Sequence, residues 1–268
     1  MWAKASDEQR TSLVLQVLVS MVFGVAALLL PAAGRCSTQP AAGVLRLYYY
    51  ERPPFHYTDS QGHVLGSIAV NAAAVLSRAG LNFEWVPMPA NRILQTIRSE
   101  TGRTCSAGWY STPQRRADFR LSLPMIRDKP LIALVRANFP VKPGTTARSF
   151  FELPTVRLLV KQNFSQGAYM DALIAHMPVE RVQRVALEVP QMVRMLKADR
   201  ADVIITTEAE ASIFVGSAGL LMRDFKIVRF PDVPAEEFRY LICSRGIDTP
   251  TMTRINKAIE AVGVLDPS

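Results

Sequence analysis

Apolar residues along the chain follow two spacings that predict strands alternating with helices. A run rich in aliphatic and aromatic residues at 44–50 is typical of a strand, and 67–80 carries its apolar residues at helical spacing. A strand at 81–89, an amphipathic helix at 90–100 and a strand at 104–110 are predicted next. This alternation predicts a parallel α/β sheet.

The second half of the chain repeats this order without repeating the sequence. Strands are predicted at 156–162, 182–188, 201–207 and 221–231, with helices at 165–177, 189–200 and 209–219 between them. A last strand at 237–246 precedes a helix at 249–263, for which Thr249 is the expected cap. Two α/β units of similar size predict two lobes with a cleft between them.

We expect the chain to cross between these lobes twice, near Arg136–Val141 and near Val233–Arg239. Lobe one would then comprise residues 43–137 and 237–268, and lobe two residues 138–236. Parallel sheets bind ligands beyond the carboxyl ends of their strands, so the segments that follow the strands are the expected site.

The first 42 residues differ in composition from the rest. Lys4 and Arg10 precede an apolar stretch at 11–30, and small and polar residues follow it. Charged, apolar and small-residue regions in this order are typical of a secretory signal peptide and leader, with cleavage expected between residues 34 and 43. This predicts an exported, periplasmic protein. The apolar stretch is also long enough to span a bilayer, so an uncleaved anchor is the alternative.

Composition and charge indicate which kinds of molecule the protein could bind. The chain has 268 residues, of which 49% are hydrophobic and 20% charged, and a net charge of +8 at pH 7. The basic residues are scattered and no finger, basic-zipper or RNP motif is present, so we expect the positive charge to favour small anionic solutes or an anionic envelope, and no nucleic acid. The histidines at 56, 63 and 176 lack metal-site spacing, and no cofactor motif is found. We therefore expect neither a metal nor a cofactor.

The segment 107–124 carries the clearest candidate for binding chemistry. A predicted strand is broken at Thr112, which suits a helix N-cap, and Pro113 suits the first helical position. The free N–H groups and positive dipole of a helix start favour an anion. Arg115, one turn into this helix, offers a planar fork that matches a carboxylate. The segment predicts an anion receptor, with an arginine on a solvated helix start as the alternative.

Several short motifs occur in the order found in one protein family. The matching residues are Pro53-Pro54-Phe55, then Asp59, Gly62 and Gly66, then Thr112-Pro113-Gln114-Arg115 with Ser122 and Pro124, and finally Leu196 with Arg200-Ala201-Asp202. In this order the chain resembles the type II periplasmic solute-binding proteins, specifically extracellular solute-binding family 3, which includes amino-acid receptors. The resemblance extends over roughly residues 44–263.

The resemblance implies a two-lobed α/β fold that closes over a small solute and delivers it to an ABC importer. It implies a monomer in which Arg115 clasps a ligand carboxylate and Arg116 lies at the surface. The chain lacks the acidic residues that follow the position of Gly66 in amino-acid receptors. The expected ligand is therefore a small polar or carboxylate-bearing solute.

Further ligand contacts are expected at strand ends and helix starts around the cleft. These residues are Tyr50, Phe55, Arg92, Trp109, Tyr110, Ser165, Gly167, Thr207 and Glu208. The aromatic residues would form a wall of the site or pack in the core, and Arg92 would face the cleft or solvent. The turn that opens the helix at 165–177 would present N–H groups to an anion.

The two cysteines well inside the chain are expected to be neighbours. In the fold that the chain resembles, the strand at 237–246 inserts beside the strand at 104–110, which would bring Cys243 next to Cys105. A close pair of cysteines in an oxidising compartment is usually bonded, and two buried free thiols are the alternative.

Two other functions are consistent with the sequence. A periplasmic enzyme on the same fold, resembling the cyclohexadienyl dehydratases, would use a cleft carboxylate such as Glu208 as general acid or base. The sequence contains no nucleophile–base pair that requires such chemistry. A membrane-anchored sensory binding domain would retain the N-terminal apolar stretch.

Overall fold

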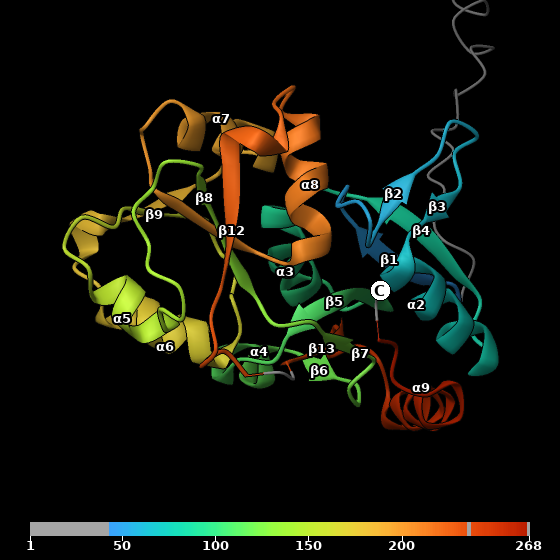
Figure 1. Ribbon diagram of the computed structural model, residues 1–268. Helices are drawn as coiled ribbons and strands as arrows, with labels where there is room; N and C mark the ends of the chain where they lie inside the picture. The colour runs from blue at the N-terminus through green and yellow to red at the C-terminus, as the bar shows by residue number, and fades with distance from the viewer. Residues whose placement is uncertain (1–42, 235–236, 267–268) are drawn as a thin grey trace, which may run out of the picture. The chain divides into compact units, whose positions relative to one another are not determined.

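The computed structural model describes residues 43–234 and 237–266 (Figure 1). The predicted signal peptide, leader and alternative anchor at 1–42 lie outside the described residues. Within the described ranges, every helix is too short or too polar to cross a membrane.

The first sheet is mixed, with parallel strands early in the chain and an antiparallel strand from its end. Its order is β4-β1-β5-β13-β6, and β7 also pairs with β13. The strands are β1 (Leu45–Tyr49), β4 (Phe83–Pro87), β5 (Thr104–Tyr110), β6 (Arg120–Leu121), β7 (Ile126–Asp128) and β13 (Glu237–Cys243). β1 is parallel to β4 and β5, whereas β13 is antiparallel to β5. A two-stranded sheet of β2 (Tyr57–Thr58) and β3 (Val64–Leu65) precedes the first helix.

Helices cover both faces of this sheet because its strands alternate between two cores. Leu45 and Leu47 of β1 pack with α2 (Ser67–Arg78) and α9 (Thr249–Val262). Tyr48, the residue after Leu47, points to the opposite face of the sheet and packs with α3 (Ala90–Ser99). We call the sheet and these helices, with the short α4 (Pro113–Asp118), lobe one.

The second sheet has the order β10-β9-β11-β8-β12. Its strands are β8 (Ile132–Arg136), β9 (Leu158–Lys161), β10 (Val182–Val185), β11 (Val203–Thr206) and β12 (Phe225–Arg229). The helices are α5 (Ala147–Glu152), α6 (Ala168–His176), α7 (Val189–Lys197) and α8 (Glu208–Ser217), with 3₁₀ turns η2 (Val179–Arg181) and η3 (Met222–Asp224). α5 and α6 cover one face, and α7 and α8 the other. We call this unit lobe two.

The predicted order of strands and helices is found in both lobes, but two details differ. The first crossing was expected near Arg136–Val141; this is wrong, because Ile132–Arg136 pairs with β11 and β12 inside the second sheet. The crossing therefore lies between β7 and β8. The second falls between β12 and β13, in the expected region. Asp248, rather than Thr249, caps α9, because its carboxylate accepts from the Thr251 N–H.

The two inner cysteines lie opposite one another in neighbouring strands. Cys105 of β5 and Cys243 of β13 are register partners, and their sulfur atoms are joined at 2.00 Å. Both residues are fully buried in the core between the sheet, α2 and α9. The structure thus contains the disulfide expected from the resemblance, and this bond ties the end of lobe one to its beginning.

Candidate functional site

The candidate site lies where the ends of parallel strands from both lobes meet. Residues 50–53 follow β1, residues 111–115 follow β5, and residues 162–167 follow β9. These segments and the start of α8 line two neighbouring cavities. The general expectation that ligands bind beyond the carboxyl ends of parallel strands therefore points to this region.

Arg115 lies in lobe one, in the first turn of α4. The Thr112 hydroxyl accepts from the Arg115 N–H at 3.2 Å, as predicted for an N-cap, and Pro113 begins the helix. The Arg115 side chain turns back to β5, donating from Nη1 to the Tyr110 carbonyl at 2.8 Å and lying over the Trp109 ring at 5.1 Å. It is 7% exposed, so the alternative of a solvated arginine is wrong.

Arg115 also reaches lobe two. Its Nη2 lies 3.5 Å from the Asn163 carbonyl, in the loop between β9 and α6. Asn163 has a positive φ of 64°, a conformation that asparagine tolerates better than most residues. The loop therefore turns sharply after β9, where it presents a carbonyl to the guanidinium of the other lobe.

Arg115 has no ionic partner in the part of the chain that the structure describes: no carboxylate pairs with it. Burial lowers the pKa of its guanidinium to about 10, and the nearby charge of Asp171 offsets only part of this effect. The group is still cationic at neutral pH. It borders a groove of about 640 Å³, which Trp109 and Ser165 also line. A buried cation beside an open groove is suited to an anion.

Three aromatic rings join the lobes next to this groove. Phe164 of lobe two lies 5.8 Å from Tyr50 and 5.9 Å from Trp109, both of lobe one, measured between ring centroids. Tyr50 and Trp109 are 6.0 Å apart. Phe164, with Ser165 and Gln166, borders both the Arg115 groove and the second cavity. The segment 164–166 is thus the wall that the two cavities share.

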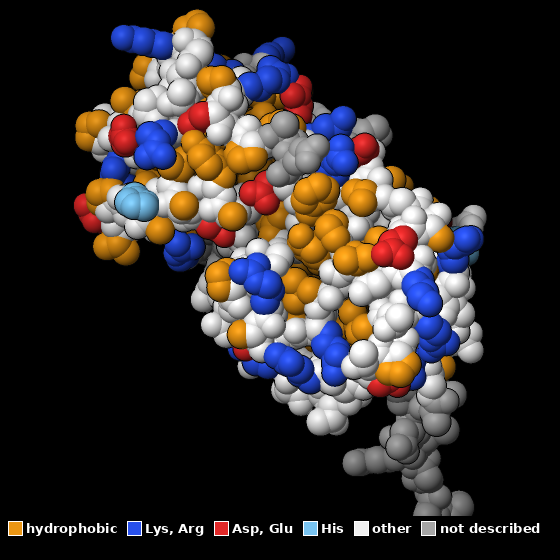
Figure 2. Space-filling model, turned by 90° about the horizontal axis from the view of Figure 1, so that it is seen from below, with side chains coloured by type: hydrophobic (Ala, Val, Ile, Leu, Met, Phe, Trp, Pro, Cys, Tyr) orange, Lys and Arg blue, Asp and Glu red, His pale blue; other side chains and the backbone are white. Residues whose placement is uncertain are grey.

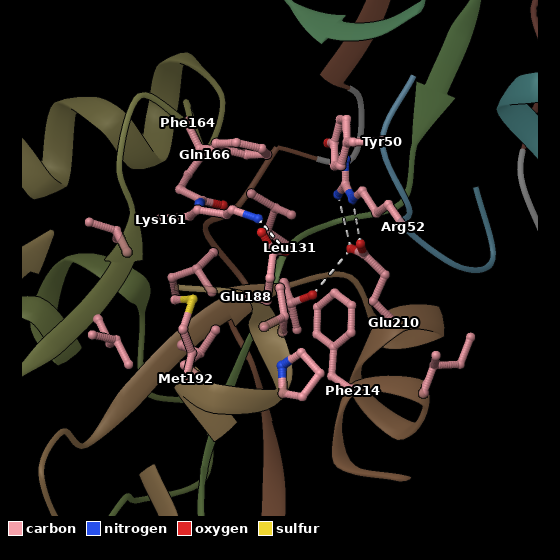
Figure 3. A pocket seen from close by; sticks show the side chains of 18 of the residues that line it. Tyr50, Arg52, Leu131, Lys161, Phe164, Gln166, Glu188, Met192, Glu210 and Phe214 are labelled. Atoms are coloured by element: carbon pink, nitrogen blue, oxygen red, sulfur yellow. Dashed lines mark hydrogen bonds and ion pairs between the residues drawn. The ribbon is translucent and has the colours of Figure 1, made fainter. Parts of the chain in front are cut away.

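An ion pair also connects the lobes. Arg52 Nε and Nη2 donate to the two carboxylate oxygens of Glu210 at 2.6 and 3.1 Å (Figure 3). Burial raises the pKa of Glu210, but the Arg52 guanidinium outweighs it and holds that pKa below its usual value. The Thr206 and Thr207 hydroxyls donate to the same carboxylate at 3.1 and 2.9 Å. Glu210 is therefore an ionised, fully engaged carboxylate at the start of α8.

A second buried arginine supports the lobe-one side of the site. Arg239 donates from Nε to Asp128 at 2.7 Å and from Nη2 to the Tyr110 hydroxyl at 2.9 Å. Its Nη1 donates to the Gly108 carbonyl at 3.0 Å. Burial lowers the pKa of His56 to about 3, with the charges of Arg52 and Arg239 acting in the same direction. His56 is therefore neutral at physiological pH.

The second cavity, which we call the chamber, has a volume of about 380 Å³. Its apolar wall comes from lobe two, and Arg52, Tyr50, Tyr110 and Arg239 of lobe one contribute to its rim. In the view of Figure 3, Met192 and Phe214 lie in the lower half, and the Arg52–Glu210 and Lys161–Glu188 pairs lie above them. The chamber is large enough for a small organic molecule.

The structure brings five of the predicted ligand contacts to these cavities. Trp109 and Arg115 border the groove, Tyr50 and Tyr110 border the chamber, and Ser165 borders both. Ser165 donates to Asp171 at 2.5 Å, so its hydroxyl is already engaged.

The other five predicted contacts lie elsewhere. Phe55 is buried in the core of lobe one, and Arg92 is exposed on α3. Gly167 has a φ of 83° and is the N-cap residue of α6, where a side chain would meet Glu237. Thr207 and Glu208 border neither the groove nor the chamber.

Glu208 is paired with Arg229 and 52% exposed, whereas Glu210 is buried. Residues two apart on a helix point to nearly opposite sides, so only one of these glutamates can face the cleft.

Sequence reasoning missed Arg52, Lys161, Phe164 and Glu210. The Thr207–Glu210 spacing is a capping box, and this signal could have identified Glu210. Within the described ranges, no group of three or more His, Cys, Asp or Glu side chains could hold a metal ion. On the face in Figure 2, Lys and Arg side chains are dispersed among other residues instead of forming one basic patch.

Several solved structures of solute-binding proteins resemble the two lobes of this chain. An ancestral arginine-binding protein bound to arginine is 21% identical, with a TM-score of 0.64, over 82% of this chain and 92% of that chain. ArtJ from Geobacillus stearothermophilus, an arginine-, lysine- and histidine-binding protein, is 20% identical, with a TM-score of 0.64, over 82% and 89%.

The ancestral amino acid-binding protein AncCDT-1, a precursor of cyclohexadienyl dehydratase, is 17% identical, with a TM-score of 0.61, over 82% and 88%. At these identities the likeness establishes the two-lobed fold alone. A search of curated proteins gave no match. The model of the bacterial extracellular solute-binding proteins, family 3, matches residues 46–178. Through this segment, and with the two-lobed fold, the chain belongs to family 3 of the bacterial extracellular solute-binding proteins.

Proposed function

We propose that this solute-binding protein captures a small carboxylate-bearing solute between its lobes, with Arg115 as the partner of the carboxylate. The observation that carries the proposal is the Arg115 guanidinium, which is buried and borders a groove yet pairs with no described carboxylate. A ligand carboxylate would complete this site with a charge-assisted, bidentate hydrogen bond.

Binding would act through closure of the lobes. Arg115 belongs to lobe one and Asn163 and Phe164 to lobe two, so a solute between them contacts both. A ligand shifts the balance between open and closed forms by the contacts that it makes in only one of them. The described residues that lead from one lobe to the other, 129–131 and 230–234, would serve as the hinge.

We further propose that the protein is exported to the periplasm, acts as a monomer and delivers its solute to an ABC importer. The N-terminal composition and the family support export. The Cys105–Cys243 disulfide is of the kind that persists in oxidising compartments. N-terminal sequencing of the protein secreted by a bacterial host should give a start between residues 34 and 43. A start at residue 1 would contradict cleavage and favour an anchor.

Binding, rather than catalysis, is the function we propose. Glu208, the expected general acid or base, is half-exposed and paired with Arg229. Glu210 faces the cleft, but Arg52 lowers its pKa, whereas a general acid at neutral pH needs a raised one. When the protein is incubated with prephenate or arogenate, we expect neither compound to be converted. Turnover of either compound would overturn this proposal.

A thermal-shift screen of amino acids, organic acids and polyamines, followed by calorimetry, tests the carboxylate proposal. Arg115→Gln should weaken binding of a carboxylate ligand by roughly 2 to 5 kcal/mol, as when one partner of a buried charge pair is truncated. Arg116→Gln is the matched control, because the Arg116 side chain is exposed and donates to the Ser111 hydroxyl, outside the groove and the chamber. Preference for polyamines, or equal binding by the Arg115 and Arg116 variants, would contradict the proposal.

A further inference from the structure

The groove beside Arg115 carries a single positive charge in excess. Its charged lining residues are Arg98, Arg115, Arg184 and Asp171. Arg98 is paired with Asp118, whereas no described carboxylate pairs with Arg115 or Arg184. Asp171, the one carboxylate among the described lining residues, offsets one of these two arginines. A solute with a single net negative charge would balance the groove, whereas a zwitterion would leave the excess in place.

Side-chain amides from both lobes form part of the groove wall. Trp109 and Phe119 also line the groove, but both are buried. The amide side chains are exposed or half-buried, and they belong to Asn91, Gln95, Asn163 and Gln166. In the part of the chain that the structure describes, none of these amide groups has a hydrogen-bond partner. The groove therefore offers uncharged donors and acceptors beside its excess charge.

These amides and the Asp171 carboxylate are suited to hydroxyl groups. An amide side chain has N–H donors and a carbonyl acceptor, and a hydroxyl both donates and accepts. Asp171 accepts from the Ser165 hydroxyl at 2.5 Å and from the Gln166 N–H at 2.8 Å, and a carboxylate has room for about two more donors. An aliphatic body would leave these polar groups without partners once the lobes closed over it, which is unfavourable.

We propose that the solute is a hydroxylated monocarboxylate of the sugar-acid class. Its carboxylate pairs with Arg115, and its hydroxyl groups bond to Asp171 and to the amide side chains of the groove. This inference rests on the proposed function and names its substrate class. The groove, at about 640 Å³, is large enough for a six-carbon acid. Gln95 belongs to lobe one and Asp171 to lobe two, so the hydroxyl groups would also favour closure.

Calorimetry on the purified protein compares D-gluconate, D-galactonate and D-glucuronate with three matched compounds. Hexanoate keeps the carboxylate and the carbon count but has no hydroxyl groups, D-glucitol has the hydroxyl groups without the carboxylate, and L-2-aminohexanoate adds an ammonium to hexanoate. At least one sugar acid should bind about tenfold or more tightly than each matched compound. Equal or tighter binding of any matched compound, or no binding of the sugar acids at millimolar concentration, would overturn the inference.

A variant of the groove wall tests the role of the amides. Gln95→Leu removes one amide and keeps a side chain of similar length. Gln61→Leu, in an exposed turn outside the groove and the chamber, is its matched control. Gln95→Leu should weaken the best sugar acid by about fivefold or more without weakening hexanoate. Arg115→Gln should weaken both compounds, and Gln61→Leu neither.

The outcomes separate this inference from the carboxylate proposal. If Arg115→Gln weakens carboxylates but Gln95→Leu does not weaken the sugar acid, the proposed function stands and the assignment of the amides fails. If sugar acids bind and Arg115→Gln leaves their affinity unchanged, the role of Arg115 fails, and the proposed function fails with it. Melting temperatures establish that each variant is folded, and the comparison of compounds on the unaltered protein needs no variant.

Discussion

The Arg52–Glu210 ion pair provides a direct test of how the lobes are held together. Its atoms approach to 2.6 Å, and the exposed fractions of the two side chains are 15% for Arg52 and 1% for Glu210. Replacing either residue leaves a buried charge without its partner. Breaking a buried pair costs roughly 3 kcal/mol or more, and opening of the lobes would relieve part of this cost by readmitting water.

A double-mutant cycle measures the interaction itself. We expect Arg52→Gln and Glu210→Gln each to lower the free energy of unfolding in urea. The double variant should lose less than the sum of the two, with a coupling energy of about 2 kcal/mol. The difference arises because the second substitution removes the charge that the first one left unpaired.

Arg229 and Glu208 form the matched control. They are also an arginine and a glutamate joined through two guanidinium nitrogens, but both lie within lobe two and are more than half exposed. An exposed pair contributes about 1 kcal/mol at most. If the Arg52–Glu210 coupling is no larger than that of the control pair, the two residues do not meet in the ligand-free protein, and the lobes are not held by this contact.

Three further predictions follow from other contacts. Replacing Cys105 and Cys243 together by alanine should lower the free energy of unfolding by about 4 to 5 kcal/mol, since the bond closes a loop with a sequence separation of 138; two thiols alkylated without reductant would show that the bond is absent. Thr112→Ala should cost about 1 kcal/mol by removing the cap of α4, and unchanged urea denaturation would contradict that role. The folded-state pKa of Glu210 is depressed, so its stabilisation is complete above the ordinary glutamate pKa of about 4.3 and is lost as pH falls through the lower folded value. The stability of the unaltered protein should therefore fall more steeply in acid than that of Glu210→Gln, and parallel pH profiles would refute this.

Local patterns were sufficient to predict the alternation of strands and helices. Apolar spacing distinguishes a strand from a helix within one segment, and Thr112 with Pro113 marks a helix start by chemistry that depends on neighbours in sequence. The first crossing was misplaced because 130–136 is a short apolar run. Such a run predicts a buried strand but not the sheet to which that strand belongs.

The site was only partly predictable because its central contacts are non-local. Arg52 and Glu210 are 158 residues apart and belong to different lobes, so no spacing rule connects them. The choice of Glu208 over Glu210 depends on the rotation of α8 about its axis, which the loop before it determines. Arg115 could be identified because its cap and its strand end lie in one short segment.

The position of β13 has a consequence for folding when the chain becomes available with its N-terminus first. All five strands of the second sheet lie within residues 132–229, so that sheet can assemble before residue 237 is available. β13 lies between β5 and β6, and until it arrives β5 has an unpaired edge. Lobe one, although it begins first, is therefore completed last. During this interval Cys105 is a free thiol open to mispairing, and the nascent chain needs protection from edge-to-edge association until Cys243 arrives.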